Sequence, residues 1–269
     1  MDVHSPAIRS DFIFARFDGE VIDRGDHVLV RTPQNPGFWW GNYLVFPSPP
    51  RPGDLKRWRE TFAEEFANDP GVKHEAYAWE PTDGSTGTAD EFVAEEFTLD
   101  LTVAQTLTPE RLSRPRKWND EVEVRPINLD AESDEVLAAH VARSPPEYEP
   151  ASFAEFLTKQ WARYRRMIDA GLGHWYGAFL EGELVGDMGI FVEDRLARCQ
   201  AVGTAEPHRR KGICGTLMHG ACSHAFNEQG AEQVLLMADE TYHAAGIYRT
   251  VGFRDTEKVR DLTRRPPQG

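Results

Sequence analysis

The sequence predicts an α/β (α+β) fold in which helices flank a mixed, mostly antiparallel sheet. Strand-like and helix-like apolar patterns alternate along its 269 residues. Segments 175–180 and 184–192 are predicted strands joined by Glu181-Gly182-Glu183, which indicates an antiparallel hairpin. A further strand, 198–204, leads through a glycine-containing turn into a helix. The hairpin argues against a doubly wound parallel sheet, and the length allows one large domain or two small ones.

In the N-terminal half the apolar pattern predicts strands at 26–31 and 39–46 and a helix at 54–68. Leu55, Trp58, Phe62 and Phe66 share one face of that helix, which Asp54 can cap and which Asp69-Pro70-Gly71 ends. A strand at 72–79, a short helix at 89–95 and a strand at 97–103 follow. We interpret Trp39, Trp40 and Trp58 as core aromatics.

A polar, proline-containing stretch, 108–119, is a predicted linker. A linker at this place predicts two domains, 1–115 and 116–269. The second is expected to contain a strand at 121–129 and a helix at 133–142, then a helix that begins at the capping box Ser152-x-x-Glu155. After the hairpin and the 198–204 strand come a helix to about Gln229, a strand at 233–238, a helix at 243–250 and a strand at 254–259.

The turn between strand 198–204 and the next helix reads Pro207-His-Arg-Arg-Lys-Gly-Ile-Cys-Gly-Thr216. The start of a helix leaves backbone N–H groups without partners, and the helix dipole adds partial positive charge there. Arg209, Arg210 and Lys211 add three cations. This pattern favours binding of a phosphate group, although the cations alone would also suit a solvated turn. A Gly-x-Gly-x-x-Gly dinucleotide motif and a Gly-Lys-Ser/Thr phosphate loop are both missing from the sequence.

Two spaced motifs give the C-terminal half a family resemblance. Arg209-x-x-Gly212-x-Cys214 resembles the Gln/Arg-x-x-Gly-x-Gly/Ala signature of the GNAT superfamily of acyl-CoA-dependent N-acyltransferases, with cysteine at the last position. Downstream, Thr241-x-x-Ala244-x-x-Ile247-Tyr248-x-x-x-Gly252-Phe253 is similar to the superfamily's Asn-x-x-Ala-x-x-Leu-Tyr-x-x-x-Gly-Phe, with threonine for asparagine. The resemblance extends from about Glu121 to the C-terminus and implies a GNAT-like fold.

The resemblance implies an N-acetyltransferase that uses acetyl-CoA as cosubstrate, acts on a primary amine and needs no metal. In such a protein the backbone of Val202 and Thr204 would bind the pantetheine arm. The pyrophosphate would lie on the segment Arg209, Arg210, Lys211, Gly212, Ile213, Cys214, Gly215 and Thr216. Tyr248 would be the general acid that protonates the leaving thiolate; the alternative is that it only packs on its helix.

A second hypothesis for the function of the chain is a CoA-binding sensor or scaffold with little turnover.

Other side chains are also candidates for chemistry. Asp239, Glu240, Glu206 and Gln200 are candidates for a general base, yet each also suits a cap or a solvated side chain. Cys214 at a helix start could be a nucleophile with a lowered pKa, but an amine can attack a thioester directly. His219 and His224 are five residues apart, which does not suit a shared zinc site on one helix face.

Composition limits the partners and the compartment. The net charge is −14, and residues 1–119 (13 basic, 20 acidic) and 120–269 (17 basic, 24 acidic) each contribute −7. Because both halves are negatively charged, neither is a basic nucleic-acid module. The negative charge also weakly favours a cationic small-molecule or peptide amine as acceptor. Three cysteines, the start of the sequence and the lack of a long apolar run predict a cytoplasmic protein without a membrane segment. Homodimerisation is left open.

The N-terminal half repeats the predicted element order of the C-terminal half, which suggests a degenerate GNAT-like or accessory domain and a tandem arrangement. At the position of the cationic turn it has Pro47-Ser-Pro-Pro-Arg-Pro-Gly53. Its four prolines supply no backbone N–H donors. We therefore expect one coenzyme site per chain, in the C-terminal half, with the N-terminal half forming a wall of the acceptor cleft or an interface.

Overall fold

The computed structural model describes residues 1–145, 149–239 and 244–265. These residues form two compact units. The described part of the first unit is 1–105, 237–239 and 255–265, and that of the second is 106–145, 149–236 and 244–254. The predicted boundary at 115/116 divides the chain once. The chain passes between the units within β5 (Thr98–Leu107), within β10 (Gln233–Asp239) and at the start of β11 (Arg254–Arg264). No helix in these ranges has both the length and the apolar character needed to span a membrane.

The first unit combines short strands with three helices of the N-terminal half and the last strand of the chain. Its elements are α1 (Pro6–Asp18), β1 (Glu20–Asp23), β2 (Val28–Arg31), the 3₁₀ helix η1 (Trp39–Gly41), β3 (Tyr43–Phe46), α2 (Asp54–Glu65), β4 (Glu75–Trp79), α3 (Ala89–Val93), β5 (Thr98–Leu107) and β11 (Arg254–Arg264). β1, β2 and β3 pair antiparallel in that order, β3 and β4 pair parallel, and β11 pairs antiparallel with β4.

Side chains of alternate residues separate the first unit into two cores, one on each face of its sheet. Leu44, Phe46, Tyr77 and Trp79 face a cluster that includes Trp58 and Phe62 of α2 and Phe92 of α3. Their strand neighbours, such as Tyr43 and Val45, face the other cluster, which includes Ile8 and Phe12 of α1. A shift of one residue in register would exchange the two faces, so this alternation specifies the strand pairing.

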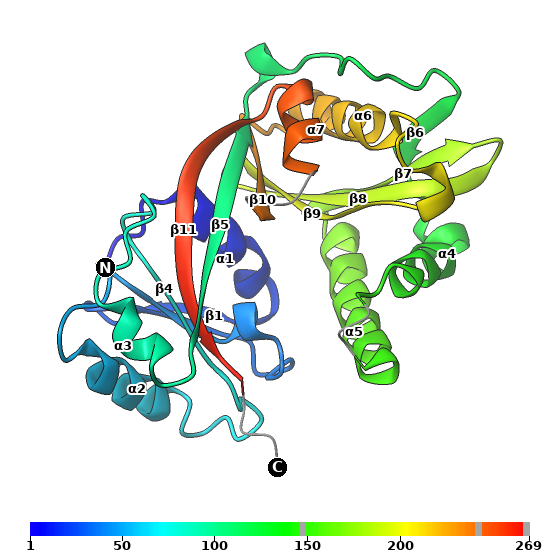
Figure 1. Cartoon of the computed structure of the whole chain (residues 1–269). Helices are drawn as coiled ribbons and strands as arrows, with labels where there is room; N and C mark the ends of the chain where they lie inside the picture. The colour runs from blue at the N-terminus through cyan, green and yellow to red at the C-terminus, as the bar shows by residue number, and fades with distance from the viewer. Residues whose placement is uncertain (146–148, 240–243, 266–269) are drawn as a thin grey trace. The chain divides into compact units, whose positions relative to one another are not determined.

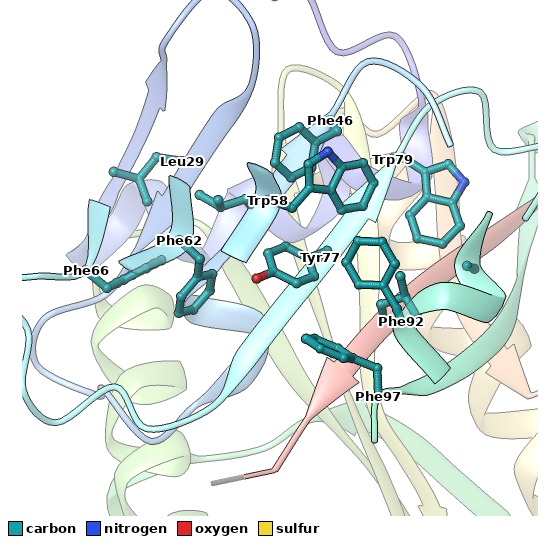
Figure 2. Close-up of a cluster of buried hydrophobic side chains, with 12 residues drawn as sticks. Leu29, Phe46, Trp58, Phe62, Phe66, Tyr77, Trp79, Phe92 and Phe97 are labelled. Atoms are coloured by element: carbon teal, nitrogen blue, oxygen red, sulfur yellow. The ribbon is translucent and has the colours of Figure 1, made fainter. Parts of the chain in front are cut away.

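Aromatic rings dominate the core beneath α2 and α3 (Figure 2). The Trp58 ring stacks on Phe46 with centroids 4.0 Å apart and an angle of 5° between the rings. Trp58 is fully buried, as predicted, but Trp39 and Trp40 are only half-buried. They lie on η1, which replaces the first part of the predicted 39–46 strand, and Trp40 packs at the edge of the α1 core.

The second unit contains the predicted hairpin and the cationic turn. Its elements are η2 (Pro109–Arg111), β6 (Val122–Pro126), α4 (Leu129–Ala142), α5 (Pro150–Asp169), β7 (Gly173–Leu180), β8 (Glu183–Glu193), β9 (Leu196–Thr204), η3 (Glu206–His208), α6 (Ile213–Glu228), the first residues of β10 (Gln233–Asp239) and α7 (Ala244–Val251). β6 to β9 pair antiparallel in sequence order, and β10 pairs parallel with β9. α4 and α5 lie on one side of these strands, and α6 and α7 on the other (Figure 1).

The predicted α/β class with a mixed, mostly antiparallel sheet is confirmed, and the predicted starts of two helices are corrected. The helix predicted to begin at the Ser152 capping box begins at Pro150, because Glu149 accepts the N–H groups of Ala151 and Ser152. Gly53, not Asp54, is the cap residue of α2. Helix α1 and strand β1 were not predicted from the sequence.

The two halves of the chain repeat one element order. β2-β3-α2-β4-α3-β5 corresponds to β8-β9-α6-β10-α7-β11. In each repeat the strand before the longer helix pairs parallel with the strand after it. The order predicted from sequence is therefore present in the structure.

Candidate functional site

The β9 strand carries a bulge near its C-terminal end. Gly189 pairs with Gln200 and Asp187 pairs with Gly203, so Ala201 and Val202 together oppose Met188. Ala201 has a φ of +49°, a left-handed conformation that is uncommon for a residue with a side chain. An extra residue in a strand leaves backbone groups outside the ladder. The bulge therefore makes backbone groups of β9 available for another partner.

The turn between β9 and α6 is shaped by two left-handed residues. Arg210 has a φ of +62°, and Gly212, the cap residue of α6, has a φ of +87°. The Arg209 guanidinium donates from Nε to the Thr204 carbonyl at 3.4 Å, which ties the turn to the end of β9. The N–H groups at the start of α6 lack partners within the helix. They add to the positive charge of the arginines at one end of the helix.

The segment predicted to be a linker packs against this turn. Lys117 Nζ donates to the Arg210 carbonyl, and Asn119 Nδ2 donates to the Lys211 carbonyl at 3.1 Å. In a trans peptide the C=O and N–H groups point in opposite directions. The N–H groups of Lys211 and Gly212 therefore point away from the segment that binds these carbonyls.

The two glycines of the turn permit this close packing. A Cβ on Gly212 would lie 2.9 Å from the Lys117 carbonyl oxygen, and one on Gly215 would lie 3.0 Å from Pro115 Cγ. Both distances are shorter than an unstrained carbon contact. Glycine at both positions thus serves the packing of segment 115–117, and Gly212 also gives the turn its shape.

A cavity of about 700 Å³ joins the bulge, the turn and α7 within the second unit. It is lined by Pro115, Arg116, Lys117, Arg143, Val202, Gly203, Thr204, His208, Arg209, Arg210, Gly212, Ile213, Cys214, Gly215, Gly246, Ile247, Tyr248 and Thr250. Its size is within the range of small-molecule sites. Arg209 and Arg210 lie in the turn before α6, and residues of β9 form another part of the wall.

Most residues selected from the sequence for coenzyme binding and for acid catalysis line this cavity, but two do not. Lys211 is exposed outside the lining. Thr216 is buried; its N–H donates to the Gly212 carbonyl, and its Oγ1 accepts the Asn119 N–H at 3.0 Å. Thr216 thus holds the turn and segment 115–119 together, and its N–H already has an acceptor.

Tyr248 lies on α7, is 7% exposed and is part of the cavity lining. Its ring packs against Phe253, with centroids 6.3 Å apart. Packing on the helix and a role as general acid are therefore compatible for Tyr248, because its ring contacts Phe253 while the residue still borders the cavity.

The alternative of a reactive Cys214 is not supported. Burial raises the pKa of the Cys214 thiol to about 12, opposite to the lowered value that a nucleophile at a helix start would need. The thiol is protonated at neutral pH.

The general-base candidates are scattered. Gln200 accepts a hydrogen bond from the Tyr164 hydroxyl at 3.3 Å, and Glu206 is exposed on η3. Asp239 ends β10, while Glu240 and Thr241 lie outside the described residues. Segment 115–117 and Arg143 were missed as site residues. The basic run Arg114-Pro-Arg-Lys117 was a usable signal for the segment, whereas nothing local marks Arg143.

The chain belongs to the acetyltransferase (GNAT) family, whose model matches residues 116–253. That range contains the bulge, the cationic turn and Tyr248. No curated protein sequence matches the chain significantly.

Solved structures share the fold over nearly the whole chain. A functionally unknown conserved protein from Staphylococcus epidermidis ATCC 12228 is similar with a TM-score of 0.73 and 16% identity, over 92% of this chain and 94% of its own. A GCN5-related N-acetyltransferase from Kribbella flavida is similar with a TM-score of 0.68 and 18% identity, over 100% and 97%. A tandem GNAT protein from the clavulanic acid biosynthesis pathway is similar with a TM-score of 0.55 and 14% identity, over 81% and 71%. The GNAT-like fold and its tandem form are thus shared by the whole chain.

Proposed function

We propose that this protein is an N-acetyltransferase that transfers an acetyl group from acetyl-CoA to a primary amine. The proposal is carried by one observation: a single cavity is lined by the β9 bulge, the start of α6 and Tyr248. These supply, in order, backbone groups for an extended amide-containing arm, donors for phosphate, and a proton donor.

The cavity lining fits the coenzyme chemically. The pyrophosphate is assigned to the turn, where the α6 N-terminus and the cations Arg209 and Arg210 favour negative charge. Rigid backbone donors bind without loss of side-chain rotamer freedom. The pantetheine arm is assigned to Val202 and Thr204 beside the bulge.

Acetyl-CoA supplies an activated acyl group: the thioester C–S bond breaks, a C–N bond to the amine forms, and the leaving thiolate takes up a proton. Tyr248 is proposed to donate that proton, since a phenol with a pKa near ~10 is protonated at neutral pH. Backbone N–H groups of Val202 to Thr204 are proposed to stabilise negative charge on the acyl oxygen. The amine must react in its neutral form. The proton that its nitrogen loses on forming the amide leaves to water, and Tyr248 regains its own proton from water.

The test measures free thiol release from acetyl-CoA with a panel of primary amines, for the natural protein and Tyr248→Phe. We expect amine-dependent thiol release that falls about 10²-fold or more in Tyr248→Phe, as is typical for loss of a general acid. The Kd for CoA should change little, because the hydroxyl is assigned to the acyl end.

Tyr176 is a second buried tyrosine, outside the cavity lining, whose hydroxyl lies 3.0 Å from His224 Nδ1. The matched control Tyr176→Phe should therefore keep its turnover.

CoA binding without thiol release from any amine would instead support the sensor or scaffold hypothesis. Unchanged turnover in Tyr248→Phe would remove this tyrosine from the mechanism while leaving the transferase proposal in place.

A further inference from the structure

Arg143, at the C-terminal end of α4, adds a cation to the cavity wall that does not come from the turn before α6. It caps the C-terminus of α4, and its guanidinium lies against Gly203 of β9. A Cβ at position 203 would be 2.6 Å from Arg143 Cζ and 2.7 Å from Nε. A side chain at position 203 would require the guanidinium to shift. Glycine at this position therefore leaves room for the charged group beside the bulge.

A fully buried carboxylate holds this guanidinium in place. Asp187 of β8 pairs with Gly203 across the ladder and accepts from Arg143 Nη2 at 2.6 Å. Asp187 also contacts His140 Nε2 at 2.7 Å and Trp175 Nε1 at 3.1 Å. A carboxylate only accepts, so the His140 nitrogen that faces it carries a proton. Groups from α4 and β7 thus fix Asp187, and Asp187 fixes Arg143.

The guanidinium has more donors than its contact with Asp187 uses. It carries five N–H groups and no acceptor, and one of its nitrogens, Nη2, donates to Asp187 Oδ2. The side chain is 17% exposed and borders the cavity. A guanidinium binds a carboxylate through two parallel hydrogen bonds when both are held in place.

We propose that Arg143 binds a carboxylate carried by one of the two reactants near the acyl end of the cavity. This rests on the proposed function, because Val202 to Thr204 are assigned to the arm that ends in the thioester. The pyrophosphate has its own cations, Arg209 and Arg210, on the turn. The favoured source is an amine acceptor of the amino acid type; the other source of the same chemistry is a dicarboxylic acyl group.

The test compares reactant pairs that differ by one carboxylate. Acceptor pairs are glycine and methylamine, L-phenylalanine and phenethylamine, and L-lysine and 1,5-diaminopentane; the donor pair is malonyl-CoA and acetyl-CoA. We expect the carboxylated member to be preferred in kcat/KM by about tenfold or more, as for hydrogen bonds between charged groups. In Arg143→Gln this preference should fall to about one, with little change for the uncharged member. A preference for the carboxylated acceptors would identify the acceptor as the source of the carboxylate, and a preference for the carboxylated donor would identify the acyl group.

Control variants separate recognition from folding. Arg143→Gln leaves Asp187 as a buried charge without its cation, which can destabilise the unit. The double variant Arg143→Gln/Asp187→Asn removes that charge and should show the same loss of preference. Arg143→Lys keeps the charge but not the two-pronged geometry and should retain part of it. Arg195→Gln removes an exposed arginine paired with Glu232 and should behave as the natural protein.

The binding of the same compounds to CoA-loaded protein, measured by calorimetry, provides a readout that needs no turnover. Tighter binding of carboxylated members that is lost in Arg143→Gln would support the proposal even if no thiol is released and the transferase function fails. For malonyl-CoA the same measurement is made directly against acetyl-CoA. Equal use and equal binding of both members of every pair would overturn the proposal. So would a preference that survives in folded Arg143→Gln and in the double variant Arg143→Gln/Asp187→Asn.

Discussion

Asp261 is a buried carboxylate on β11 whose proton affinity should be visible in the stability of the first unit. It is 4% exposed. Burial, and then the nearby carboxylates of Asp100 and Asp11, raise its pKa to about 7, with Arg260 acting in the opposite direction. Its folded-state pKa thus lies above the ordinary value of 3.8. Between these two values the folded chain binds more protons than the unfolded chain, so this group makes stability fall as pH rises from about 4 to about 7.

We predict that Asp261→Asn reduces the loss of stability between pH 5 and pH 8 and makes the protein more stable than the natural one at pH 8. The amide has the same shape and no charge to bury. Urea denaturation midpoints at several pH values measure the effect. Asp134→Asn, an exposed change on α4, is the control. Parallel pH profiles for the natural protein and Asp261→Asn would contradict the assignment.

Residues such as Asp261 and Arg143 show what the sequence alone could not predict. Asp261 is buried because β4, which is distant in sequence, pairs with β11 and places Ala78 opposite it. Arg143 is a site residue because Gly203, sixty positions away, leaves room for it. Local patterns contain neither fact. By contrast, the Pro207–Thr216 turn was predictable because its strand, glycine and helix start are contiguous in sequence.

At the scale of elements, α6 begins and ends with glycines in the same backbone conformation and different surroundings. Gly212 has a φ of +87° and its added Cβ would lie 2.9 Å from the Lys117 carbonyl oxygen. Gly230, just beyond the helix C-terminus, has a φ of +70° with open space around the added atom. Substitutions at these two positions therefore distinguish the cost of backbone strain, which both share, from the cost of disturbing the packing of the turn, which only Gly212 has.

We predict that Gly212→Ala and Gly230→Ala both lower the free energy of unfolding, by about 1–2 kcal/mol for the left-handed conformation. Gly212→Ala should cost more, because segment 115–117 must also move. It should also weaken CoA binding, since the turn carries the proposed phosphate donors, whereas Gly230→Ala should leave the Kd for CoA unchanged. Thermal denaturation and calorimetric titration with CoA measure the two effects. Equal CoA affinity in both variants would place the phosphates elsewhere.

Element prediction succeeded where the apolar period was long and failed at ends and at short segments. The α2 face of Trp58 and Phe62 and the 173–193 hairpin were found because packing follows the pattern directly. α1 was missed although Ser5 caps it and Pro6 occupies its first position, both recognisable signals. Within the predicted linker, 108–119, two polar side chains have a structural partner: Lys117 and Asn119 donate to carbonyl groups of the turn before α6.

At the scale of the whole molecule, the repeat preserves the geometry of the turn but not its chemistry. Gly53 before α2 has φ +90° and ψ −9°, close to φ +87° and ψ −7° for Gly212 before α6. In the first unit, backbone groups of the corresponding turn already have hydrogen-bond partners within the chain. The Arg51 N–H donates to Asp54 Oδ2 at 2.9 Å, and the Pro50 carbonyl accepts the Thr88 N–H at 2.7 Å. A carboxylate thus occupies a donor that a phosphate would need.

This difference predicts one coenzyme per chain. Calorimetric titration with CoA should give a stoichiometry near one, because prolines 47, 49, 50 and 52 supply no N–H groups to the first turn and Asp54 repels phosphate there. Arg210→Glu, which reverses a charge at the second turn, should abolish this binding rather than halve it. The matched change Arg51→Glu at the first turn should leave both stoichiometry and affinity as they are. A stoichiometry of two, or one bound coenzyme remaining in Arg210→Glu, would mean that the first unit retains a site of its own.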